Sequence, residues 1–78
     1  MNENITLDRL EKGKGARVQK LCANPVLRRR LIDMGFVKNA KIECVEESPM
    51  GNPRAYKILS FVIALRNEDA RDIMVRRV

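Results

Sequence analysis

The side chains that could perform chemistry in this 78-residue chain are two cysteines and ten carboxylates, and the chain has no histidine. Transition-metal sites in proteins usually include imidazole ligands, often together with carboxylates. Glu46 and Glu47 are neighbours in a predicted strand, so their side chains point to opposite faces and cannot easily share a cation. Glu68 and Asp69 form the other adjacent acidic pair. The sequence therefore predicts no metal site.

Catalytic groups are equally sparse. No histidine is present to act as a base, and no serine or cysteine stands beside a plausible activating group. Gly13-Lys14-Gly15 is too short for a phosphate-binding loop and is interpreted as a flexible connection. These absences argue against an enzyme and against a bound cofactor, so function has to be sought on the surface.

The two cysteines, Cys22 and Cys44, lie on either side of a predicted helix in the patterns V-x-x-L-C and I-E-C-V. We interpret both as small, buried, apolar residues rather than as a disulfide. The N-terminus does not resemble a signal peptide, and no apolar run approaches the ~18 residues of a membrane span. A cytosolic protein with reduced thiols is the expectation.

The net charge of +6 is compatible with nucleic acid, an acidic protein surface or an anionic membrane as partner. It is also ordinary for a small domain, for which a net charge of ~2–8 serves solubility. The basic residues are spread along the chain, and only Arg28-Arg29-Arg30 forms a cluster. Charge alone does not choose among these partners.

The best-defined element is a helix that begins at Asn24-Pro25. Asparagine caps the free N–H groups, and proline suits the first helical position. Leu27, Leu31 and Met34 share one apolar face, so the three arginines point largely outward. Gly35 should end the helix in a left-handed conformation, with Phe36 folding back on Leu31.

Short strands account for most of the remaining chain. Residues 16–22 form the first, and residues 40–47 the second, with a bulge or bend at Val45. After the loop 48–53, residues 56–58 and 61–65 pair around a turn at Leu59-Ser60, and residues 73–75 form the last strand. A helical turn is expected at 67–70 and a shorter one at 6–10. The expected core includes Leu31, Met34, Ile42, Ile63 and Leu65. This pattern predicts one mainly β domain, residues 1–78, shaped as a small, highly bent barrel of about five strands.

Four motifs in fixed order carry a family resemblance: R-x-L-x-x-M-G-F from Arg29, A-x-I-x-C-V from Ala40, S-P-M-G-N-P from Ser48, and I-A-L-R-x-x-x-A-x-x-I-x-V from Ile63. Together they resemble the ferrous iron transport protein A (FeoA) family over roughly residues 5–75. The resemblance implies an SH3-like barrel with a helix inserted after the first strand. Two family glycines are replaced, by Asn39 and by Ser60. Asparagine tolerates positive φ better than serine does.

The resemblance further implies a cytosolic accessory protein of a bacterial ferrous iron uptake system. Its partner would be the membrane permease of that system, which carries a cytosolic G-protein domain. Peripheral attachment to the inner membrane through that partner, and self-association, are left open. The expected contact residues are the exposed loop Pro49-Met50-Gly51 and the basic helix face at Arg28 and Arg29. The loop could equally cover one open end of the barrel.

The alternative function is a nucleic-acid-binding small barrel. Proteins that bind single strands stack bases on exposed aromatic side chains. The chain has only Tyr56, Phe36 and Phe61. Both phenylalanines are expected in the core, which leaves Tyr56 as the one candidate and makes nucleic acid the less favoured partner.

Overall fold

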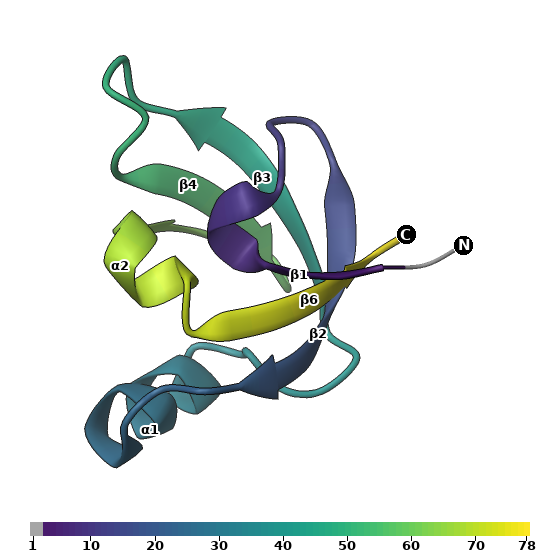
Figure 1. Cartoon of the computed structure of the whole chain (residues 1–78), viewed down its shortest axis with the longest axis vertical. Helices are drawn as coiled ribbons and strands as arrows, with labels where there is room; N and C mark the ends of the chain where they lie inside the picture. Colours follow the sequence, from purple (N-terminus) through teal and green to yellow (C-terminus); the bar gives the residue numbers. More distant parts are fainter. Residues whose placement is uncertain (1–2) are drawn as a thin grey trace.

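Residues 3–78 are described by a computed structural model in which six short strands form one antiparallel sheet (Figure 1). The strand order is β1-β6-β2-β3-β4-β5. The strands are β1 (Asn4–Thr6), β2 (Gly15–Leu21), β3 (Lys41–Glu47), β4 (Arg54–Ile58), β5 (Phe61–Leu65) and β6 (Ile73–Arg77). The helices are the 3-10 turn η1 (Leu7–Arg9), α1 (Pro25–Asp33) and α2 (Asn67–Ala70). The mainly β architecture is confirmed, and β1 is an additional strand that the sequence did not indicate.

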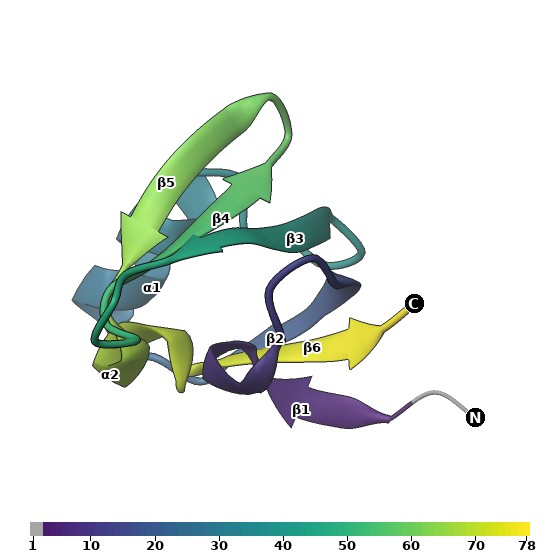
Figure 2. The ribbon, with the colours of Figure 1, turned by 90° about the horizontal axis from the view of Figure 1, so that it is seen from above.

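The sheet curls so that alternate side chains meet in one core. Figure 2 shows β3, β4 and β5 on one side and β1, β6 and β2 on the other. Within residues 3–78 no ladder joins β1 to β5, so the wall stays open between these two edge strands. Of the expected core, Leu31, Ile42 and Leu65 are buried, while Met34 and Ile63 are partly buried against them.

Helix α1 begins and ends as expected. The N–H of Leu27 donates to Oδ1 of Asn24 over 2.9 Å, and Pro25 occupies the first helical position. At the other end Gly35 has φ +106°, its N–H donates to the carbonyl of Ile32, and the N–H of Phe36 donates to the carbonyl of Leu31. These two bonds are the Schellman ending, which leaves Phe36 buried beside Leu31.

The expected irregularities of the sheet are present. The β3–β4 register shifts between Cys44 and Glu46, which places the bulge at Val45. Ile58 pairs with Phe61, so the hairpin turn is Leu59-Ser60. The positive φ of this turn, +56°, belongs to Leu59 and not to the serine that replaces the family glycine. Asn39 also has positive φ, at +71°.

Burial of Cys22 was expected and is wrong, whereas Cys44 is buried. The β2–β6 register shifts between Val18 and Lys20, so one extra residue enters β2 at this point. Beyond such a bulge the alternation of side chains changes phase. Leu21 therefore packs against the core, and the next residue, Cys22, faces solvent.

The assignment of the aromatic side chains was also partly wrong. Phe61 was expected in the core but is exposed, because it closes the hairpin on the edge strand β5. Tyr56 was the candidate for base stacking but is buried in β4, between β3 and β5, with its hydroxyl 3.5 Å from the carbonyl oxygen of Leu7. The structure therefore removes the one aromatic side chain that favoured binding of single-stranded nucleic acid.

Candidate interaction surface

A groove with apolar walls lies between the C-terminal end of α1 and the β4–β5 hairpin. Its volume is about 400 Å³, and it is lined by Ile32, Asp33, Met34, Gly35, Leu59, Phe61, Val62 and Ile63. Leu59, Phe61 and Val62 are 65%, 60% and 63% exposed. Asp33 is the one charged side chain of this lining, and Arg29 lies 3.8 Å from its carboxylate. We call these eight residues the apolar groove.

The two walls of the groove meet at Gly35. A Cβ atom at this position would lie 2.9 Å from Cδ1 of Leu59, closer than side-chain carbons approach in proteins. Leu59 thus packs over the glycine that ends α1. The left-handed conformation of Leu59 is sparsely populated for a leucine, and such strain is typical of positions with a specific role.

One feature of the sequence does indicate the apolar groove, namely a strand that has no polar residues. Residues 61–65 read F-V-I-A-L, with no polar residue on either face of the strand. A strand with one buried face should alternate apolar and polar side chains. Since β5 is an edge strand, the surplus apolar side chains remain exposed. Leu59 in a turn, where polar residues are usual, was the second signal.

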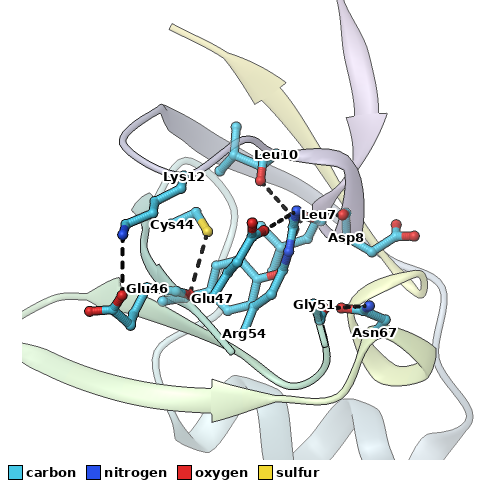
Figure 3. A network of polar contacts seen from close by, with 11 residues as sticks. Leu7, Asp8, Leu10, Lys12, Cys44, Glu46, Glu47, Gly51, Arg54 and Asn67 are labelled. Carbon is cyan, nitrogen blue, oxygen red and sulfur yellow. Dashed lines mark hydrogen bonds and ion pairs between the residues drawn. The ribbon is translucent and has the colours of Figure 1, made fainter. Parts of the chain in front are cut away.

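The loop Pro49-Met50-Gly51 lies at the opposite end of the molecule from α1 (Figure 1). Met50 is 91% exposed, so it does not cover an open end of the barrel. The loop itself is held in place, because Nδ2 of Asn67 donates to the carbonyl of Gly51 over 3.0 Å (Figure 3). The N–H of Asn67 also donates to the side chain of Asn52.

The three consecutive arginines of α1 point in different directions. Successive residues of a helix are about 100° apart, because a turn takes 3.6 residues. Arg28 faces β2 across a groove lined by Lys20 and Lys38. Arg29 lies beside Asp33, and Arg30 lies near Asp69. The predicted contact residues Arg28 and Arg29 also line one hollow together, with Ile32. This hollow lies on α1, at the other end of the molecule from the loop 49–51 (Figure 1).

Arg54 is the centre of a polar network that joins η1 to the sheet beneath the loop (Figure 3). Its guanidinium donates to the carbonyls of Asp8 and Leu10 over 2.7 and 2.8 Å, and to the carboxylate of Glu47 over 2.8 Å. Burial raises the pKa of the Tyr56 phenol, an effect that the nearby Arg54 partly opposes. Burial likewise raises the pKa of the Cys44 thiol. The network is structural, because Nη1 of Arg54 donates to two backbone carbonyls and Nη2 donates to Glu47.

Residues 3–78 contain neither a metal-binding cluster nor a membrane-spanning helix. Across residues 3–78 no three histidine, cysteine, aspartate or glutamate side chains converge on a point where a metal ion could bind. In the same part of the chain, none of the helices has the length and apolar character needed to span a membrane. The apolar groove is the candidate site because three of its apolar side chains, Leu59, Phe61 and Val62, are more than half exposed.

Known proteins resemble this chain along nearly its whole length. The FeoA domain model matches residues 5–77. A zinc-complexed FeoA from Stenotrophomonas maltophilia, described as a procaryotic SH3 domain protein, superposes with a TM-score of 0.82 at 31% identity, over 91% of this chain and 88% of that one. The fold is thus that of a small SH3-like barrel, as predicted. This chain belongs to the FeoA family.

Two further relatives agree. Iron(II) transport protein A from Clostridium thermocellum is 38% identical, with a TM-score of 0.90, over 95% of this chain and 46% of that one. An Fe(2+) transport protein A/Fe(2+) transporter FeoB fusion protein from Porphyromonas gingivalis is 33% identical over 74 residues. These cover 95% of this chain but only 9% of the fusion protein.

Proposed function

We propose that this protein is a cytosolic accessory module of a ferrous iron uptake system, and that it docks on the cytosolic G-protein portion of the membrane permease and modulates it. The observation that carries the proposal is the apolar groove. Exposed apolar side chains gathered in one depression are typical of protein-binding surfaces. Several of them line a single groove here, and the contact they offer is continuous.

The fusion relative supports the choice of partner. In that protein a segment similar to this chain is joined to an Fe(2+) transporter in one polypeptide. Such a connection keeps the two parts at high local concentration. A separate accessory chain has to supply the same proximity through its own binding surface.

The groove is suited to binding a partner rather than to catalysis. Its walls come from a helix end and a hairpin that are fixed by the Schellman bonds and by the β4–β5 ladder. A preformed surface of this kind loses little conformational entropy on association. The loop contact at Pro49, Met50 and Gly51 stays a second, separate prediction on the other end of the molecule.

Capture of the purified cytosolic portion of the permease tests the proposal. Phe61→Asp introduces a charge into the apolar groove and should weaken capture at least tenfold. Met50→Asp makes the same change in the loop, and Val26→Asp makes it at an exposed apolar position that does not line the groove. Val26→Asp should leave capture unchanged, and Met50→Asp reports how much the loop contributes.

Salt dependence separates docking from binding through phosphate charges. An apolar contact should persist as the salt concentration rises to 200 mM, with charge acting mainly on the association rate. Nucleic-acid binding should weaken steeply, because counterions are released when phosphates are neutralised. Failure of the wild-type protein to capture the permease portion, together with tight nucleic-acid binding at the same salt, would overturn the proposal.

A further inference from the structure

Three cations stand directly opposite one another on the outer face of the sheet. The pairing register places Arg76 of β6 opposite Arg17 of β2, and Arg17 opposite Lys41 of β3. Val18 and Ile42, their neighbours along β2 and β3, are buried, so the three cations share the solvent side. Side chains in such pairs lie about 4.5–5.5 Å apart at Cβ, where like charges repel.

Three more cations extend this row toward α1. Lys20, Arg28 and Lys38 line one groove between β2 and α1, together with the exposed side chains of Ile32 and Val37. The guanidinium of Arg17 donates to the carbonyl of Asn39 over 2.9 Å, which brings it beside Lys38. The six cations therefore form one surface over β6, β2, β3 and α1. We call it the cationic face: Arg17, Lys20, Arg28, Lys38, Lys41 and Arg76.

The cationic face lacks internal counter-charges. Within residues 3–78 none of its six members takes part in an ion pair. Five of the carboxylates are instead paired with other cations: Glu3, Glu11, Asp33, Glu46 and Glu47. Glu43 lines a hollow with Lys41 and Lys57, without an ion pair to either. The buried Nε of Arg76 has no hydrogen-bond partner in the described chain. An anionic partner would reduce the repulsion among the cations of this face.

We propose that the cationic face binds the anionic headgroups of a membrane surface. Its cations border the aliphatic side chains of Ile32 and Val37, and this combination is characteristic of surfaces that lie at the interface of a bilayer. The apolar side chains can enter the boundary between headgroups and acyl chains, while the lysine and arginine heads stay among the phosphates. This binding does not depend on the docking proposed above.

The same surface fits nucleic acid less well. Base stacking requires exposed aromatic side chains. No exposed aromatic side chain lies on the cationic face. Phe36 is fully buried, and Phe61 belongs to the apolar groove. A duplex would be held by its phosphates alone, and the exposed Ile32 and Val37 would gain no partner.

Co-sedimentation of the full chain with vesicles tests the inference at about 0.15 M ionic strength, where the screening length is about 8 Å. Binding is expected to vesicles of phosphatidylcholine mixed with phosphatidylglycerol, and not to phosphatidylcholine alone. A basic residue near an anionic surface contributes about fivefold to partitioning. The triple variant Lys20→Gln, Lys38→Gln, Lys41→Gln should therefore lower partitioning roughly 100-fold.

A matched control removes the same charge elsewhere. Arg9→Gln, Arg66→Gln, Arg71→Gln also neutralises three exposed cations, none of them on the cationic face. It should lower partitioning less than fivefold. Equal losses for the two triple variants would mean that net charge alone attracts the protein, and would overturn the inference. So would an absence of binding to the mixed vesicles, or tighter binding to duplex DNA than to the vesicles at equal salt.

Discussion

The apolar groove and the loop around Met50 both expose apolar side chains, yet they are built differently. The groove gathers side chains from a helix end and a hairpin, and Leu59 packs over Gly35 where these meet. The loop exposes one methionine on a backbone held by Asn67. Met50 is therefore the most exposed of these side chains. The groove, however, offers a partner the larger continuous apolar area.

This difference shows that a binding surface depends on neighbours from distant parts of the chain. A single exposed side chain is common on soluble proteins and needs no explanation. A patch that gathers several is uncommon and is usually functional. The groove is thus also the region where mutations should affect structure and binding together.

The largest effect is expected for Leu31→Ala. Leu31 is fully buried and attaches α1, one wall of the groove, to the core. Removing such a side chain costs about 2–5 kcal/mol of unfolding free energy. Urea unfolding measures the cost, with Met50→Ala as the exposed counterpart, expected within about 0.5 kcal/mol of wild type. A Leu31→Ala protein as stable as wild type would show that α1 does not depend on this contact.

Gly35→Ala should have the next largest effect, about 1–3 kcal/mol, because a side chain is forced into a positive-φ conformation. Gly51→Ala in the loop is its control. Gly51 has φ +79°, and a Cβ there would meet nothing within 4 Å, whereas at Gly35 it would meet Leu59. Thermal or urea unfolding of both variants separates backbone strain from the contact. Equal costs would mean that Leu59 moves away freely.

Asn67→Ala should cost about 1 kcal/mol, the usual contribution of one hydrogen bond. It removes the bond from Nδ2 to the carbonyl of Gly51 and keeps the bond from the Asn67 N–H to Asn52. Its effect should be confined to the loop, so the fluorescence of an apolar probe bound in the groove should not change. A change at the groove would contradict the independence of the two regions.

Alkaline pH should gradually lower the unfolding free energy, through two ionisable groups that are buried beneath the loop. Thiols and phenols ionise at roughly pH 8.5 and 10 in an unfolded chain. Burial raises the pKa of Cys44 and Tyr56 in the folded protein, so the unfolded state loses these protons first. The unfolding free energy should therefore fall as the pH rises above about 8.5, and these groups should contribute no slope well below it.

Urea unfolding at increasing pH checks this expectation. Cys44→Ala should remove the thiol part of the decline. Tyr56→Phe should remove the phenol part. A decline that is unchanged in both variants would contradict the assignment.

Local features of the fold could be predicted because their causes lie within a few residues. Asn24, Pro25 and Gly35 specify both ends of α1, and Val45 marks the bulge of β3. The turn at Leu59-Ser60 follows from the apolar runs on either side. The strand β1 was missed, because three residues are too few for a pattern of alternation.

The barrel and the helix could be predicted from the sequence, since periodicity, capping and turn chemistry are properties of neighbouring residues. The FeoA family followed from the resemblance of four motifs. Which side chains share a surface depended on the folded chain. A bulge in β2 turned Cys22 outward, the edge position of β5 exposed Phe61, and the strand register aligned Arg76, Arg17 and Lys41. These outcomes depend on pairings between residues far apart in the chain, and no local pattern records them.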